Sequence, residues 1–210
     1  MLKNNTLWFF LLLGLVVPGF ASAADYTEGR HYLPLSQPMP TVLEEGQHEV
    51  IEFFWYGCPS CFQFEPHIEI WLDDKPDNVK FTRIPAIVGD PQPAPVWLAH
   101  ARIYYALEAM GALPQAHSLL FDGIHEQGRR LNTVDAVARF LSQHGIDGEK
   151  LKTYTLSPEV SAKVSRARQL SQQHITGVPT VVIDGQFKTS ARQAGGFGQI
   201  LEVVDQLIAE

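Results

Sequence analysis

Cys58 and Cys61 are the only two cysteines among the 210 residues, and they lie three positions apart in the segment FFWYGCPSC. Two thiols at this spacing can serve as a structural disulfide, as half of a metal site or as a redox centre. A disulfide between them would close a very short loop, and the stabilisation that a disulfide gives grows with the length of that loop. We therefore do not expect a structural role for this pair.

A metal site also matches the sequence poorly. A structural zinc ion needs four ligands, usually from a second CxxC pair or from two histidines at short spacing. The chain has no third cysteine, and no two of its eight histidines form an HxxxH or HxxxxH pair. We thus predict a redox-active pair and no metal, and we expect no bound cofactor because the disulfide itself would be the reagent.

The surroundings of Cys58 predict which sulfur reacts. An apolar run, 50–56, ends just before it and an amphipathic pattern follows, so Cys58 would be the N-cap of a helix with Pro59 at the first helical position. The amides of Ser60 and Cys61 would then point at the Cys58 sulfur and, with the helix dipole, favour its thiolate. A stabilised thiolate favours the reduced protein, which makes the disulfide oxidising. We expect Cys58 to face solvent and Cys61 to be tucked against the helix and the sheet.

The elements that must position this pair predict an α/β fold. The run 50–56 is almost continuously apolar, which is typical of a strand covered on both faces. A helix follows it, and the alternating stretch 79–84 reads as a second strand, so this region predicts a βαβ unit. Near the C-terminus, residues 181–183 run into an Asp-Gly turn as in a β-hairpin, and an amphipathic helix covers 200–208.

The middle of the chain has a different pattern. A proline-rich break at 91–95 is followed by helical patterns alone, and a further helix is predicted to start at Ser157. We therefore predict a mixed sheet flanked by helices, formed by 24–90 and 158–210 and interrupted by an all-helical insertion at 91–157.

The first 23 residues have the pattern of a signal peptide. Lys3 precedes the apolar run 7–17, which is too short to cross a bilayer core of about 30 Å as a helix. The small residues up to Ala23 fit cleavage after that position. Export implies an oxidising compartment such as the periplasm. Loss of Lys3 makes the formal charge of -7 one unit more negative, and such an acidic chain is not expected to bind nucleic acid.

The segment VIEFFWYGCPSCFQFEP (50–66) resembles the active-site segment of the DsbA proteins, the thiol–disulfide oxidases of the bacterial periplasm. A second segment, HITGVPT (174–180), matches the proline loop of that family. The resemblance spans most of the chain after the leader and is specific in these two segments. It implies a thioredoxin-like fold with a helical insertion, and exported proteins with free cysteines as substrates. It also implies reoxidation by a quinone-linked membrane protein of the DsbB type.

The resemblance further implies roles for four residues outside the CxxC pair. The Val178-Pro179 bond would be cis and packed against the pair, and the Val178 backbone would pair with a bound peptide by strand addition. Glu52 would be a buried proton acceptor for Cys61, although the residues alone leave open a strand-end acid that faces solvent. Arg83 falls where the family often has a lysine. Because arginine does not deprotonate, we expect Glu52 to be held more firmly ionised than it would be beside a lysine.

Two positions depart from the family pattern. Ser60 replaces the histidine of the CPHC motif and can offer only a neutral hydrogen bond, so we predict a weaker oxidant than a CPHC relative. Gly57 replaces an aromatic residue that often precedes the first cysteine. A disulfide reductase or isomerase on the same fold is the nearest alternative to an oxidase, and a peptide-binding chaperone is the alternative from another class. Isomerases commonly add a dimerisation domain, for which 24–50 leaves no room. Nothing in the sequence demands a dimer, so we expect a monomer.

Overall fold

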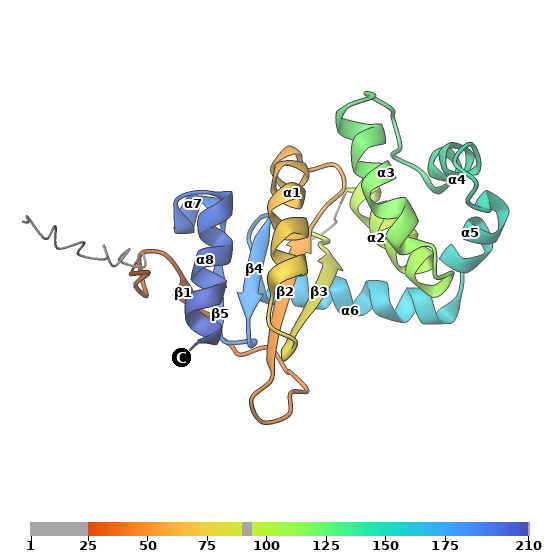
Figure 1. Ribbon diagram of the computed structural model, residues 1–210. Helices are drawn as coiled ribbons and strands as arrows, with labels where there is room; N and C mark the ends of the chain where they lie inside the picture. The colour runs from red at the N-terminus through yellow and green to blue at the C-terminus, as the bar shows by residue number, and fades with distance from the viewer. Residues whose placement is uncertain (1–24, 90–93, 210) are drawn as a thin grey trace, which may run out of the picture.

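A mixed five-stranded sheet forms the centre of the computed structural model, which describes residues 25–89 and 94–209 (Figure 1). The strand order is β1-β5-β4-β2-β3, and only β2 and β3 are parallel among its paired strands. The strands are β1 (Leu33–Pro34), β2 (His48–Phe54), β3 (Val79–Pro85), β4 (Thr180–Ile183) and β5 (Phe187–Thr189). The predicted signal peptide, 1–23, lies outside the described residues.

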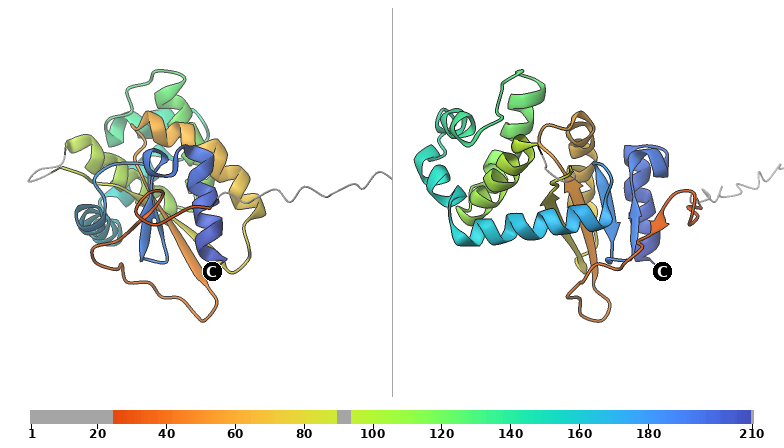
Figure 2. Two further views of the ribbon diagram at one scale, coloured as in Figure 1. Left: turned by 90° about the vertical axis from the view of Figure 1, so that its left-hand side faces the viewer. Right: turned by 180° about the vertical axis from the view of Figure 1, so that it is seen from behind.

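Helices cover both faces of this sheet. On one face α1 (Pro59–Asp74) and α8 (Phe197–Ile208) pack against each other, and α6 (Pro158–His174) crosses the other face, as the view from behind in Figure 2 shows. Alternate residues of a strand point to opposite faces. Val50 therefore joins the apolar cluster under α1 and α8, while Ile51 joins the cluster under α6. Burial on both faces explains why apolar residues of β2 occur in adjacent positions, as the sequence predicted.

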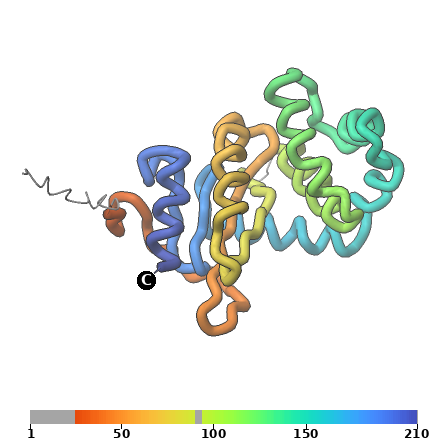
Figure 3. Tube along the Cα trace, viewed as in Figure 1, coloured from red at the N-terminus to blue at the C-terminus, as the bar shows by residue number. Residues whose placement is uncertain are grey.

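Four further helices gather at one end of the molecule (Figure 3). They are α2 (Pro95–Ala109), α3 (Leu113–His125), α4 (Val134–Ser142) and α5 (Gly148–Thr155). The predicted start at Ser157 is confirmed, because its side chain accepts a hydrogen bond from the Val160 amide and caps α6. α6 packs against α2 and α5 as well as under the sheet, so one helix ties the helical group to the sheet.

Most predicted elements are present with small shifts at their ends. The parallel pairing of β2 with β3 confirms the βαβ unit, and β2 ends at Phe54, before the predicted end of the apolar run. The β4–β5 hairpin is also confirmed. Asp184 and Gly185 in its loop both have left-handed φ angles, of 49° and 63°, which explains the Asp-Gly pair. β1 and α7 (Ala191–Ala194) were not predicted, since elements this short carry no periodic pattern.

Candidate active site

Cys58 lies where the end of β2 turns into α1. It is the N-cap of α1, with extended backbone angles (φ -90°, ψ 115°), and Pro59 opens the helix. The Cys61 amide donates to the Cys58 sulfur at 3.3 Å, and both cysteines are free thiols in this structure. The predicted N-cap geometry is therefore confirmed, and the first-turn donors are aimed at one sulfur.

The exposure of the two cysteines corrects one expectation. Cys61 is completely buried, as expected, but Cys58 retains only 8% of its surface rather than facing solvent openly. The cause is the loop before β4, whose Val178 carbonyl lies 3.6 Å from the Cys58 sulfur and accepts its S–H. The resemblance implied that this loop packs against the pair, but the sequence did not indicate how closely the loop covers the sulfur.

The two thiols have opposite electrostatic environments. The hydrogen bond from the Cys61 thiol lowers the pKa of Cys58 from 9.0 to about 6, and the backbone amides of Cys61 and Ser60 contribute, while partial burial opposes them. Burial raises the pKa of Cys61, and so do the contact with Cys58 and the charge of Glu52. At neutral pH Cys58 is thus a thiolate and Cys61 a thiol.

The Val178-Pro179 bond is cis, as the resemblance implied. Pro179 directly precedes β4, and the Thr180 hydroxyl donates to the Gly177 carbonyl at 2.8 Å, which fixes the loop. Ser60, Val178 and Pro179 line one pocket of about 260 Å³ beside the reactive sulfur. The structure therefore brings these three predicted site residues together.

Glu52 is fully buried, which excludes the alternative of a solvent-facing acid. Arg83 donates from Nε to Glu52 Oε2 at 3.1 Å. Arg83 favours the ionised form of Glu52, but burial and then the charge of Glu65 raise the pKa of Glu52 to about 8 against that effect. The single positive charge of Arg83 is shared between two carboxylates, since its Nη2 also donates to Glu65 Oε2 at 2.9 Å.

Sequence reasoning missed Glu65 and two partners that extend this site. His117 of α3 places Nε2 at 3.4 Å from Glu65 Oε1, and the Tyr56 hydroxyl lies 2.9 Å from His117 Nδ1. Glu65 could have been found, because it is four residues after the buried Cys61 and therefore on the same face of α1. His117 could not, since nothing in the sequence relates α3 to this face.

The packing around position 57 explains why a glycine precedes Cys58. A Cβ atom on Gly57 would come within 2.4 Å of the Trp55 indole, which stacks on Trp97 of α2 with ring centroids 4.2 Å apart. An aromatic residue at position 57 is thus incompatible with this tryptophan stack.

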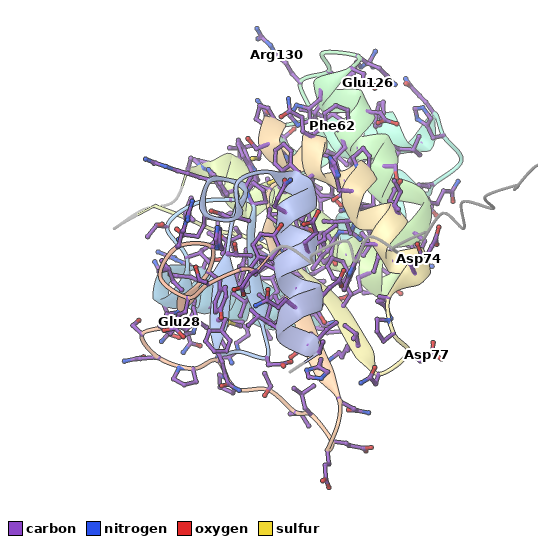
Figure 4. The ribbon with its side chains drawn as sticks, turned by 60° about the vertical axis from the view of Figure 1, so that its left-hand side comes forward. Glu28, Phe62, Asp74, Asp77, Glu126 and Arg130 are labelled. Atoms are coloured by element: carbon purple, nitrogen blue, oxygen red, sulfur yellow. The ribbon has the colours of Figure 1, made fainter. Side chains whose placement is uncertain are left out.

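On the other side of the turn, Phe62 stacks on His125 at the end of α3; Figure 4 labels Phe62, with Glu126 and Arg130 beyond it.

Comparison with known proteins agrees with this geometry. Residues 49–200 match the model of the family described as DSBA-like thioredoxin domain. The chain belongs to this family. Among curated DsbA relatives, the thiol:disulfide interchange protein of Azotobacter vinelandii is 39% identical over 95% of this chain and 96% of its own. That of Pseudomonas aeruginosa PAO1 is 37% identical over 99% of this chain and 96% of its own.

Solved DsbA structures share the fold. The crystal structure of Pseudomonas aeruginosa DsbA superposes with a TM-score of 0.79 at 37% identity, covering 88% of this chain and 94% of that one. DsbA from Xylella fastidiosa gives a TM-score of 0.75 at 27% identity, covering 85% and 94%. The thioredoxin-like fold with added helices is thereby confirmed. Like its DsbA relatives, this chain is a thiol:disulfide oxidoreductase with one CxxC pair.

Metal-binding groups and membrane-spanning helices were also sought among the described residues. No group of three or more histidine, cysteine, aspartate or glutamate side chains among them could hold a metal ion. None of their helices is both long and apolar enough to cross a membrane.

Proposed function

We propose that this member of the DsbA family is a dithiol oxidase that introduces disulfide bonds into exported proteins with free cysteines. What supports the oxidising direction is the contrast between its two thiols. The lowered pKa of Cys58 stabilises the reduced protein relative to the disulfide, so electrons flow from substrate thiols to the CxxC pair.

The proposed reaction has two exchange steps. A substrate thiolate attacks the Cys58 sulfur, the Cys58–Cys61 bond breaks, and Cys61 leaves as a thiolate that takes up a proton. A second substrate thiolate then attacks the substrate sulfur of the mixed disulfide and expels Cys58. Because Cys58 is the more acidic thiol, it is the better leaving group in this second step. The substrate loses two electrons, and the enzyme ends as a dithiol.

The remaining parts of the proposal concern the cellular setting. The leader 1–23 would direct export to the periplasm with cleavage after Ala23. A quinone-linked membrane protein of the DsbB type would reoxidise the dithiol, and the enzyme would act as a monomer. At the site, Val178 would pair with the substrate backbone by strand addition beside the cis Pro179.

The direction of electron flow is tested by mixing the oxidised protein with a reduced peptide that carries two cysteines. We expect stoichiometric oxidation of the peptide by the wild type and none by Cys58→Ser or Cys61→Ser, since neither variant can form the Cys58–Cys61 disulfide that takes up the two electrons. Equilibration with glutathione buffers should give a reduction potential well above that of thioredoxin, which is about -270 mV. A potential near that value, or a protein that only reduces disulfides, would instead identify a reductase.

A further inference from the structure

The pocket beside Cys58 continues into a second pocket along the proline loop. The first pocket, of about 260 Å³, includes Arg192 in its lining, and the second, of about 180 Å³, includes Lys188. The residues that line both pockets each carry a hydroxyl group, and they are Thr176, Thr180 and Ser190. The two pockets therefore form one groove, which we call the loop groove. It begins beside the reactive sulfur and leads away from it to β5.

The loop groove lies on one side of the reactive sulfur. Residues 188–193, at the end of β5 and in α7, form its outer wall. Figure 1 shows α7 and the helical group on opposite sides of α1. On the helical side, Trp55 stacks on Trp97. A peptide that lay extended across Cys58 would thus meet aromatic groups on one side and the loop groove on the other.

The side chains of the groove are polar and include two cations. Among the described residues, no aspartate or glutamate lines either pocket, although the chain has 23 acidic residues against 16 lysines and arginines. Arg192 is exposed, and its side chain has no ion pair or hydrogen bond with any residue that the structure describes. It is therefore an uncompensated cation next to the site of exchange.

Lys188 is the second cation of the groove. Its Nζ donates to the His174 carbonyl at 2.9 Å, which is a neutral partner, and no carboxylate within the described ranges pairs with it. Burial and then the charges of Lys188 and Arg166 lower the pKa of His174, and no carboxylate is among the groups that act on this histidine. The positive charge of the groove thus extends from Arg192 into the second pocket.

We propose that the loop groove selects substrate segments that carry a carboxylate a few residues from the reactive cysteine. A substrate backbone paired with Val178 would lie extended, with about 3.3 Å between successive residues and side chains that point alternately to opposite sides. An aspartate or glutamate near the cysteine then meets Arg192, and one further along on the same side meets Lys188. Both cations are thus specificity-determining residues, and the inference rests on the thiol–disulfide exchange proposed above.

The acidity of the whole chain makes this local charge decisive. With a formal charge of -7 for the full sequence, the protein as a whole repels an acidic peptide. Such a segment is therefore accepted only where cations lie close to its carboxylate. The hydroxyl groups along the groove add neutral donors for the same oxygens.

The test measures attack by Cys58 on peptides whose single cysteine is blocked as a mixed disulfide with thionitrobenzoate. The Cys58 thiolate attacks the peptide sulfur, the bond to thionitrobenzoate breaks, and the coloured thionitrobenzoate ion leaves. The Cys61→Ser background is used throughout, so that the peptide stays attached. One series of peptides carries glutamate, and a matched series glutamine, at successive positions on either side of the cysteine. Comparing their rate ratio between Arg192 and Arg192→Gln cancels the intrinsic reactivity of each peptide.

We expect Arg192→Gln to lower the glutamate-to-glutamine rate ratio by about two- to fivefold at low salt, the range of an exposed ion pair, on one side of the cysteine only. High salt should remove most of this loss, because exposed charges are screened. Arg192→Lys should keep most of the preference. Lys188→Gln should lower the ratio at a position further from the cysteine on the same side.

Arg139→Gln is the matched control. Arg139 is an exposed residue of α4 that lines neither pocket, and its replacement removes the same charge from the protein. An unchanged ratio in Arg192→Gln would overturn the proposal. An equal loss at every position, or an equal loss in Arg139→Gln, would also overturn it, since only the net charge of the protein would then act.

The assay is independent of the direction of electron flow. It needs only a reactive Cys58 thiolate, so a protein that proves to be a reductase would still show or lack the preference for glutamate. The rate constants with the glutamine peptides report any change that a substitution causes at Cys58 itself. A failure of the proposed oxidase function is therefore distinguishable from a failure of the groove to select acidic segments.

Discussion

The lowered pKa of Cys58 determines how the reduction potential must change with pH. Reduction of the disulfide consumes two protons when both products are thiols, and one when Cys58 remains a thiolate. The potential should therefore fall by about 59 mV per pH unit below pH 6 and by about 30 mV per unit above it. The raised pKa of Cys61 keeps that thiol protonated throughout the range.

The size of the effect follows from the same pKa. At pH 7 a thiol of pKa about 6 is ten parts ionised to one, whereas a thiol of pKa 9.0 is almost wholly protonated. The difference stabilises the reduced protein by about 1.4 kcal/mol, or about 30 mV, at pH 7. At pH 8 it grows to about 2.7 kcal/mol, or about 60 mV.

The measurement is an equilibration with glutathione at fixed ratios from about pH 5 to about pH 8, where glutathione itself stays largely protonated. After an acid quench and alkylation, the oxidised fraction is read by mass. The equilibrium constant for reduction should be flat below pH 6 and rise about tenfold per pH unit above it. A constant that stays flat to pH 8 would mean that Cys58 remains a thiol, and the account of the hydrogen bonds around its sulfur would be refuted.

Three other substitutions test separate parts of the site. Ser60→His should lower the pKa of Cys58 by about 1 unit and make the protein about 30 mV more oxidising; thiolate absorbance reports the pKa, and an unchanged or higher value contradicts the argument. Glu52→Gln should raise the free energy of unfolding of the reduced protein by about 3 kcal/mol at pH 7, because the raised pKa of Glu52 means that its ionisation costs stability as pH rises from 4.5 towards 8. Urea unfolding should show this gain shrinking at pH 5, and a gain independent of pH would count against it. Gly57→Ala should cost about 1–3 kcal/mol and alter tryptophan fluorescence, since the new Cβ collides with Trp55; unchanged stability and emission would show that the indole moves aside freely.

The sequence was sufficient for the features that depend on neighbours along the chain. The N-cap role of Cys58 was predicted because the apolar run 50–56 ends three residues before Pro59, and the structure confirms it. The βαβ unit follows from two strands around one helix. The same kind of reasoning fails for Cys58 exposure, because the covering Val178 carbonyl is 120 residues away along the chain. It could not weigh the pKa of Glu52 either, since Glu65 meets Arg83, and His117 meets Glu65, only in the folded protein.

The asymmetry between the two cysteines arises from one turn of helix. The first-turn amides must point out of the end of α1, so the sulfur at the N-cap receives donors that the sulfur at the third helical position cannot. The same turn carries Cys61 under the sheet, where burial penalises its thiolate. Glu52 is a buried acid whose charge adds to that penalty. Stabilising the thiolate at the N-cap and burying the other thiol are therefore consequences of the same geometry.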